Sequence, residues 1–180
     1  MKNTPLDKFV RLLRIREVIA LVPQDSVLCD FGCDEGHFLR AVKSRIKRGY
    51  GFDRRADEHK EGNLIFRRVD LNCSLPKVSA DCVTLLAVLE HMDNPEIVLK
   101  NARNLLKRGG KIIITTPTPL LEPFLKVLAL LKLIDENEIK DHKNYFTKKQ
   151  MITLLNKCGF KHVKIKRFEF GFNMLTVATK

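Results

Sequence analysis

The sequence predicts an α/β domain in which a mostly parallel sheet carries helices on both faces. Short apolar strands alternate with helical segments from Val27 to Ala178. A strand, a helix and a second strand in this order require a right-handed crossover between parallel strands. The segment from Asp81 to Leu89 is nearly all apolar, as expected of a strand that is buried on both faces.

The first predicted helix covers residues 5–21 and lies within an N-terminal segment of residues 1–24. Pro5 suits the first turn of this helix, and Pro23 with its polar neighbours ends it. Val27 to Phe31 is the first predicted strand. After a glycine-bounded turn, a second helix is expected from His37 to Arg48, where Gly49 would end it.

The rest of the chain continues the alternation and ends in two adjacent strands. The predicted elements are a strand at 50–53, a short helix or loop at 54–62, strands at 64–69 and 81–89, a helix from Asp93 to Arg108, a strand at 111–116, an amphipathic stretch at 120–134, a helix at 148–157, and strands at 163–168 and 174–178. The last two strands are expected to pair antiparallel across Gly171. No linker or repeat interrupts the chain, so a single domain of residues 1–180 is predicted.

Composition narrows the class of protein. The formal net charge is +12, but the basic residues are spread along the chain, which favours solvated faces over a patch for nucleic acid or an acidic substrate. The five cysteines are scattered without a C-x-x-C motif, which indicates reduced thiols in the cytoplasm and neither a disulfide framework nor a metal site. No signal peptide is expected, and no apolar run reaches the ~20 residues of a membrane span.

Acidic residues and glycines gather where parallel strands would end. Asp30 to Gly36 forms a turn between strand and helix, and free N–H groups at a helix start suit an anionic group. Asp53, about twenty residues after the turn, is placed to hold a ribose diol, and Asp70 could accept from an adenine amine. The turn matches neither G-x-G-x-x-G nor a P-loop. These observations indicate an adenosine-containing ligand at the carboxyl ends of the strands.

Four segments together resemble the class I S-adenosylmethionine-dependent methyltransferases. Val27 to Gly36 is similar to their first motif, acid-x-Gly-x-Gly-x-Gly. Leu86 to Met92 resembles the Leu-Glu-His segment of the small-molecule (type 11) branch, and Leu105 to Pro117 its L-K-P-G-G turn and fifth strand. The segment from His142 through Phe160 resembles the late helix and its Gly-Phe turn.

The resemblance implies a Rossmann-like sheet of seven strands in the order 3-2-1-4-5-7-6, with strand seven antiparallel. It also implies methyl transfer from S-adenosylmethionine to a small-molecule or lipid-like acceptor. The implied cofactor-binding residues are Asp30, Gly32, Cys33, Gly36, Asp53, Arg54, Asp70, Leu71, Leu86 and Ala87. His91, near the methyl group, and His142, in a polar segment, are the candidate catalytic bases, although His91 could equally be a hydrogen bonder that shapes the pocket. Residues 118–146 are the expected lid or acceptor region.

One departure from the family pattern leaves alternatives open. Asp34 replaces the second glycine of the first motif. Aspartate tolerates positive φ, but its charge near the carboxylate of the cofactor would weaken binding unless it points to the sulfonium, the amino group or solvent. A non-catalytic binding module is therefore one alternative. RNA methylation is another, since the charge is high, although Leu89 to Met92 replaces the Asp/Asn-Pro-Pro-Tyr/Phe motif of base-methylating enzymes.

Overall fold

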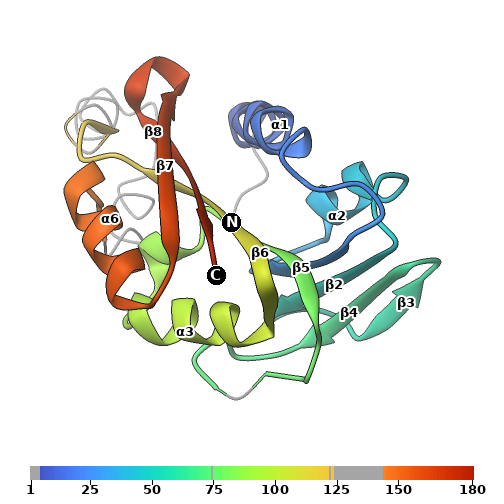
Figure 1. The fold of residues 1–180 in the computed structure, drawn as a ribbon. Coiled ribbons are helices and arrows are strands. Elements are labelled where there is room, and N and C mark those ends of the chain that lie inside the picture. The colour runs from blue at the N-terminus through green and yellow to red at the C-terminus, as the bar shows by residue number, and fades with distance from the viewer. Residues whose placement is uncertain (1–4, 74, 122, 124–143) are drawn as a thin grey trace.

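A computed structural model describes residues 5–73, 75–121, 123 and 144–180. Its centre is an eight-stranded sheet with the order β3-β4-β2-β1-β5-β6-β8-β7 (Figure 1). The strands are β1 (Val27–Phe31), β2 (Arg48–Asp53), β3 (His59–Glu61), β4 (Leu64–Arg68), β5 (Ala80–Leu86), β6 (Leu106–Pro117), β7 (Lys161–Phe168) and β8 (Asn173–Thr179). The helices are α1 (Pro5–Ile19), α2 (His37–Val42), α3 (Pro95–Leu105) and α6 (Lys148–Lys157), with 3-10 turns η1 (Leu89–His91) and η2 (Glu169–Gly171).

The predicted sheet order is confirmed, with one additional strand at its edge. Without β3, the order matches 3-2-1-4-5-7-6, and β8 is antiparallel to both β6 and β7. The expectation of a helix or loop over residues 54–62 was wrong for His59–Glu61, which pairs antiparallel with β4. His59 stacks on Phe66 with 4.5 Å between ring centroids. This contact stabilises the extended conformation of a polar segment.

The second helix is much shorter than predicted. It was expected to reach Arg48 but ends at Val42. Beyond it the backbone is held by tertiary contacts, since Lys47 N–H donates to the Ser26 carbonyl at 2.9 Å and Arg45 carbonyl accepts from Asp25 N–H at 2.9 Å. These bonds bring the chain directly into β2, which begins six residues after the helix ends.

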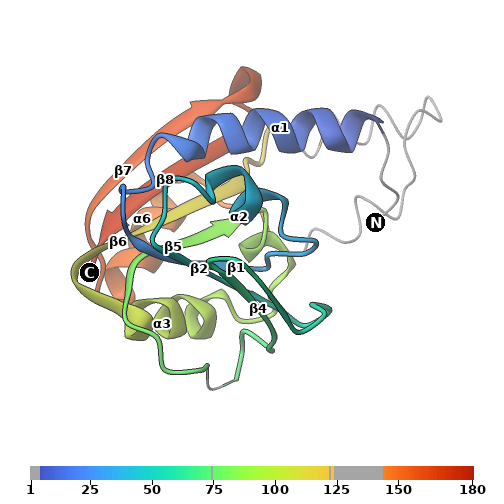
Figure 2. The same ribbon diagram turned by 90° about the vertical axis from the view of Figure 1, so that its right-hand side faces the viewer.

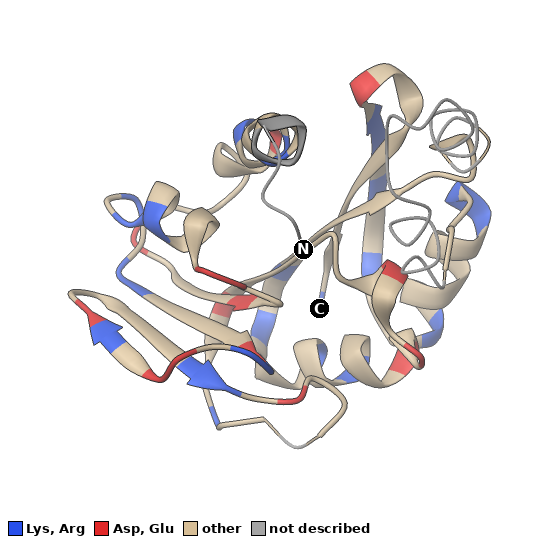
Figure 3. Ribbon diagram, turned by 180° about the vertical axis from the view of Figure 1, so that it is seen from behind, with Lys and Arg blue, Asp and Glu red and all other residues tan. Residues whose placement is uncertain are grey.

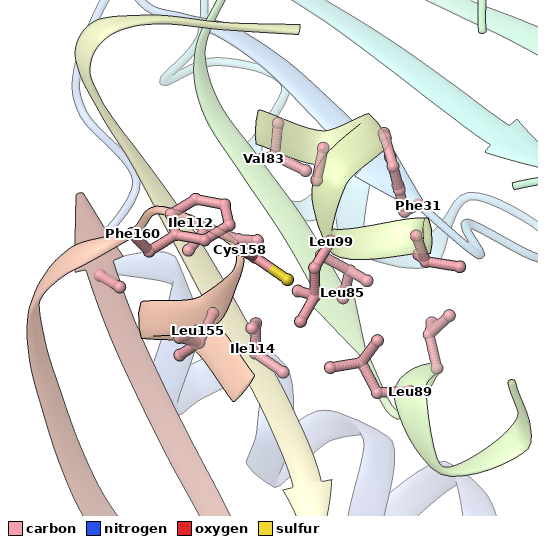
Figure 4. Packing of buried hydrophobic residues seen from close by; sticks show 14 of the residues in the cluster. Phe31, Val83, Leu85, Leu89, Leu99, Ile112, Ile114, Leu155, Cys158 and Phe160 are labelled. Atoms are coloured by element: carbon pink, nitrogen blue, oxygen red, sulfur yellow. The ribbon is translucent and has the colours of Figure 1, made fainter. Parts of the chain in front are cut away.

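Helices cover the two faces of the sheet as expected. In Figures 1 and 2, α1 and α2 lie on one face, and α3 and α6 lie on the other. The second face packs the larger core, where Leu99 of α3 and Leu155 of α6 lie with Val83, Leu85, Ile112 and Ile114 (Figure 4). Each such side chain contributes about 1.5–3 kcal/mol when fully buried, so this layer fixes β5 and β6 in place.

Both late helix starts agree with the sequence. Asn94 caps α3 by accepting from Ile97 N–H at 3.3 Å, and Pro95 occupies the first turn. Thr147 and Gln150 form a reciprocal capping box at the start of α6. Both helices begin at the carboxyl edge of the sheet, so their caps also fix the loops beside the site.

The basic residues are distributed over several elements of the described structure (Figure 3). A run of them lies on β7, which pairs only with β8 and is therefore an edge strand. Lys161, Lys164, Lys166 and Arg167 of this strand are exposed. Lysine on an edge strand prevents other chains from adding to the sheet, which gives part of the net charge a structural role.

Candidate active site

Three residues in the turn between β1 and α2 have a left-handed backbone conformation, with positive φ. Gly32 has φ 71°, Asp34 has φ 48° and Gly36 has φ 78°. Aspartate is one of the few residues other than glycine that adopts this conformation readily. The expectation that Asp34 preserves the turn is therefore confirmed, and its side chain is exposed.

Both glycines are also required by packing against the protein itself. A Cβ atom at Gly32 would lie 2.5 Å from Val88 Cγ2, and one at Gly36 would lie 2.4 Å from Phe66 Cε1. The space beside these glycines is thus filled by side chains of the protein. Their lack of a side chain lets the turn lie directly on the sheet, which places its N–H groups at the strand ends.

Asp53, the last residue of β2, connects this turn to the neighbouring strand. Its Oδ2 accepts from Asp34 N–H at 3.1 Å, and its Oδ1 accepts from Arg55 N–H at 2.8 Å. Each carboxylate oxygen has about two lone-pair sites, so each can accept one further hydrogen bond. The carboxylate is therefore oriented by the backbone and can still bind two adjacent hydroxyls.

Asp30 is a buried acid at the centre of the site. It is 3% exposed, and its Oδ1 accepts from Thr84 Oγ1 of β5 at 2.6 Å. Burial raises the pKa of Asp30 to about 7, and the nearby Asp53 charge adds to this, while the Thr84 hydrogen bond opposes it. A cationic group bound beside Asp30 would be stabilised by its ionised form.

Asp70 and Leu71 continue the site at the end of β4 but face different surroundings. Asp70 is exposed, and hydrogen bonds from Asn72 lower the pKa of its carboxyl, with a smaller contribution from the Arg54 charge. Leu71 is buried in the larger core, and its carbonyl accepts from Asn101 Nδ2 at 2.9 Å. Asn101 of α3, which sequence reasoning missed, therefore holds this loop against the sheet.

The end of β5 forms the floor beside these acids. Leu86 and Ala87 are half-buried, and Ala87 has φ 57°. Ala87 N–H donates to the Thr115 carbonyl at 3.0 Å and also approaches Thr115 Oγ1 at 3.2 Å. These bonds hold a backbone conformation that alanine rarely adopts, as is frequent at functional sites.

Two other residues from the expected cofactor set lie at the margins of the site. Arg54 is exposed just after Asp53. Cys33 is buried with its Sγ near Gly51, and burial raises the pKa of its thiol, so the thiol stays neutral and packs as an apolar group.

Beyond β5, the chain turns through η1, where Glu90 and His91 lie. His91 is half-exposed and Glu90 is 1% exposed. Asn144 holds this turn, since its Nδ2 donates to the Met92 carbonyl at 2.7 Å and its backbone N–H donates to the Glu90 carbonyl at 3.0 Å. Sequence reasoning missed Asn144 because its partners lie about fifty residues away. The other candidate base, His142, lies outside the described residues, as does most of the expected lid region, 118–146.

The described structure has one hollow at the carboxyl ends of the strands and another at their amino ends. One of about 180 Å³ lies beside the site at the carboxyl edge and is lined by Thr118, Pro119, Leu120, Phe146, Thr147, Lys148, Arg167 and Met174. A larger one of about 400 Å³ lies where β1 begins, between Val27, Lys47 and Lys107. The first hollow lies at β6, β8 and β7, whereas Asp30, Asp53 and Asp70 follow β1, β2 and β4 on the other side of β5.

The residues present fit S-adenosylmethionine. The ribose needs a hydrogen-bond acceptor with free lone pairs, which Asp53 offers, and the amino and sulfonium groups are stabilised by a nearby carboxylate, which Asp30 can provide when ionised. When bound, the cofactor provides an activated methyl group, and the protein has to orient both reactants and exclude water.

The fold and this site define a class I S-adenosylmethionine-dependent methyltransferase. A family model described as a methyltransferase domain matches residues 6–165, and the chain belongs to this methyltransferase family. S-adenosylmethionine is its cofactor.

Several solved structures share the fold. A Thermotoga maritima methyltransferase described as a possible histamine N-methyltransferase superposes with a TM-score of 0.74 at 19% identity, covering 97% of this chain and 96% of the other. A Haloferax volcanii protein solved in complex with the Trm112 methyltransferase activator gives 0.73 at 16% identity, covering 94% and 90%. At such identities these similarities show the fold alone.

Two sequence relatives match the chain over different lengths. An uncharacterized protein of Methanocaldococcus jannaschii is 34% identical over 84 residues, which span 47% of this chain but only 40% of that protein. A ubiquinone biosynthesis O-methyltransferase of Glaesserella parasuis is 23% identical over 82% of this chain and 69% of its own length. Among the described helices, none has the length and apolar character needed to cross a membrane.

Proposed function

We propose that this methyltransferase acts on a small-molecule or lipid-like acceptor. The observation that carries the proposal is the buried turn after β5, where enzymes that methylate base amino groups need room for an extruded base. Here Leu89 and Glu90 are almost fully buried, and Asn144 ties the turn to the start of α6. The distant ubiquinone O-methyltransferase relative agrees with a small acceptor.

The proposed roles follow from the positions of the side chains. Asp53 holds the ribose hydroxyls, Asp30 faces the cationic methionine end of the cofactor, and Asp70 borders the adenine. His91 lies nearest to the methyl group. The free cysteines are consistent with a reducing compartment, so we place the protein in the cytoplasm.

Calorimetric titration with S-adenosylmethionine and S-adenosylhomocysteine is the first test. Heat of binding at micromolar ligand supports a working cofactor site, whereas its absence at millimolar ligand leaves only a non-catalytic module. Incubation with methyl-labelled cofactor and a cell extract, divided into small-molecule, lipid, RNA and protein fractions, then identifies the acceptor. Label in the first or second fraction supports the proposal, and label confined to RNA or protein contradicts it.

RNA methylation is the second candidate, and the exposed basic residues of the edge strand β7 favour it. Four exposed lysines and arginines on one strand (161, 164, 166 and 167) could follow a phosphate backbone. If RNA is the substrate, its affinity should fall steeply and linearly on a log–log scale with salt, and Lys164→Glu should weaken it. Weak RNA binding that does not change with salt would contradict this second candidate, and the lysines of β7 would then serve only to protect the sheet edge.

A further inference from the structure

Four exposed apolar side chains lie at one end of the molecule. Phe9 and Leu12 of α1 are 58% and 63% exposed, Leu120 after β6 is 52% exposed, and Phe170 in η2 is 99% exposed. Among the described residues, Ile97 of α3 is the only other large apolar side chain that is exposed. Figures 1 and 2 show α1 and the η2 end of the β7–β8 hairpin at the same, upper end of the molecule. We call Phe9, Leu12, Leu120 and Phe170 the apolar rim.

Contacts between the elements bring these side chains onto one surface. Glu17 of α1 pairs at 2.8 Å with Lys166 of β7, which lies four residues before Phe170. A Cβ atom added at Gly171 of η2 would lie 3.8 Å from Leu120 Cδ2, so Leu120 lies against the same turn. The rim is therefore formed by two neighbouring elements and by the loop that follows β6.

Phe170 is held in a conformation that bulky residues rarely adopt. Its φ is 56°, and its neighbours Glu169 and Gly171 also have positive φ, at 51° and 90°. Two hydrogen bonds from Thr118 fix this turn, since its Oγ1 donates to the Gly171 carbonyl at 2.7 Å and its N–H donates to the Phe172 carbonyl at 2.8 Å. The ring consequently stays in solvent at the end of the hairpin. Strained backbone of this kind is frequent at functional sites.

Cations flank the apolar rim. Arg16 is exposed on the same face of α1 as Phe9 and Leu12, because residues four and seven positions apart share one side of a helix. Lys166 and Arg167 are exposed near the end of β7 that leads into η2. Long basic side chains can lay their carbon chains along an apolar surface and extend their charges beyond it.

The acids of the same elements are already bound. Glu17 pairs with Lys166, and Glu169 is half-buried, with its Oε2 accepting from Asn173 Nδ2. The charge that this surface offers to a partner is therefore positive.

A bilayer of anionic phospholipids matches both properties of this surface. Its acyl chains accept apolar side chains such as those of Phe170 and Leu12, and its phosphates attract arginine and lysine. A bilayer is also fluid, so it adapts to side chains that project from two separate elements. A protein partner would need a rigid surface with a matching recess for each of them, and nucleic acid would leave the apolar side chains in water.

We propose that the apolar rim docks the protein on the surface of a bilayer that contains anionic phospholipids. Phe9, Leu12 and Phe170 enter the boundary between head groups and acyl chains, while Arg16 and Arg167 stay with the phosphates. This inference goes beyond the proposed function, because the surface does not depend on the identity of the acceptor.

The position of the rim gives docking a consequence for catalysis. Leu120 and Arg167 also line the hollow of about 180 Å³ at the carboxyl ends of the strands. A docked molecule therefore holds this hollow against the membrane. A lipid-like acceptor then reaches the hollow without crossing water, and this step alone rests on the proposed function.

A single tryptophan reports insertion directly, because the chain contains none. In Phe170→Trp, vesicles of equimolar phosphatidylcholine and phosphatidylglycerol should shift the emission to shorter wavelength, and lipids brominated on their acyl chains should quench it. Ile97→Trp is the matched control, since Ile97 is exposed and apolar but lies on α3, at the lower end of the molecule in Figure 1. The emission of this control should not change.

Vesicle flotation measures the affinity. We expect the wild type to bind the equimolar vesicles more tightly than pure phosphatidylcholine vesicles by about tenfold or more. Phe170→Ser and Leu12→Ser should each weaken binding about tenfold, and Arg16→Glu should weaken binding to the equimolar vesicles alone. Ile97→Ser and Arg48→Glu, which make the same changes elsewhere on the surface, should bind like the wild type. All of these variants should keep the wild-type affinity for S-adenosylhomocysteine.

Several results would overturn the inference. No binding of the wild type to either vesicle, or equal losses in Phe170→Ser and Ile97→Ser, would contradict it. Emission of Phe170→Trp that is already shifted without lipid would also contradict it, because another part of this chain or a second copy would then cover the rim; sedimentation velocity tells these two apart. Failure of S-adenosylhomocysteine to bind the wild type would instead contradict the proposed function, and vesicle binding is measured separately from it.

Discussion

The backbone N–H of Asp34 donates to the side chain of Asp53 at 3.1 Å, so the turn after β1 and the end of β2 form one unit. The interaction uses the main chain of Asp34, and the Asp34 carboxylate remains exposed. Loss of the Asp53 carboxylate therefore removes a ligand for the ribose and also releases the turn. We expect Asp53→Ala to weaken cofactor binding by at least a hundredfold, measured by calorimetry. Asp57→Ala, an exposed acid in the same loop, is the control, and near-normal binding by Asp53→Ala would refute the ribose assignment.

Replacement of Asp34 by glycine separates its backbone role from its charge. Glycine adopts φ 48° without strain and keeps the N–H bond to Asp53, while the negative charge is lost. We expect Asp34→Gly to bind S-adenosylhomocysteine more tightly by a few-fold at low salt. Asp34→Asn has the same shape without the charge and should give a similar gain. Weaker binding in both variants would instead show that the carboxylate contacts the cationic part of the cofactor.

The glycine at the start of α2 should be intolerant of even one methyl group. Gly36→Ala combines a positive φ with a contact of 2.4 Å to the Phe66 ring, and we expect a loss of about 2–5 kcal/mol in the free energy of unfolding. Gly109→Ala is a matched control, because Gly109 has φ 74° with nothing within 4 Å of the new methyl group. Urea denaturation should show a clearly smaller loss for the control. Equal losses would mean that Phe66 moves aside at little cost.

Asp30 should make the stability of the cofactor-free protein depend on pH. Its pKa is about 7 in the folded protein and about 4 in an unfolded chain, so between these values the folded state holds a proton that the unfolded state releases. This stabilising contribution is complete below about pH 4 and is lost as the pH rises through 7. Asp30→Asn should therefore gain stability relative to the wild type between pH 5 and pH 8, by on the order of 1–4 kcal/mol. Thermal unfolding curves measure this, with Asp57→Asn as the control; parallel pH profiles would disprove it.

Asn144 should contribute to both the stability of the protein and acceptor binding, because it holds the η1 turn. Its side chain donates to two carbonyls of the η1 turn, at 2.7 Å and 3.4 Å. Asn144→Ala should cost about 1–3 kcal/mol of stability, since buried carbonyls lose their donor, and should raise the KM for the acceptor more than that for the cofactor. Asn104→Ala, at an exposed site on α3, should do neither. If Asn144→Ala changes only the KM for the cofactor, the η1 turn does not contribute to acceptor binding and the prediction is wrong.

The sequence predicted the acids at the strand ends because hydrophobic periodicity marks the strands and turn residues mark where they stop. The sheet order was implied by the resemblance to the class I methyltransferases, and the structure confirms it. The sequence misplaced the end of α2, since the bonds that end the helix come from Asp25 and Ser26, on a different segment. The strand β3 was not predicted, because its residues are polar and show no hydrophobic pattern typical of a strand. The Gly62–Asn63 pair before β4 is a typical hairpin turn and could have revealed it.

Hydrogen bonds between side chains and distant segments could not be predicted from the sequence. Thr84 binds Asp30, Asn101 binds Leu71 and Asn144 binds Met92. Each pair is 30 to 54 residues apart along the chain, and no local pattern marks it. Arg14 looked like one of many solvated basic residues, and only the fold brings it to Glu90 and Glu169.

The docking of α1 also determines how the protein can fold during synthesis. This helix is synthesised before the sheet, yet its Glu17 pairs with Lys166, 149 residues later, and its Arg14 faces a turn in the same late hairpin. The central pair of β1 and β5 likewise joins residues more than fifty positions apart. Contacts this distant close slowly, so in the nascent chain α1 can pack on α2 and β1 but lacks its contacts to the late hairpin until β7 and β8 have emerged. Because this hairpin holds both Lys166 and Glu169, α1 reaches its final position only after β7 and β8 have been synthesised.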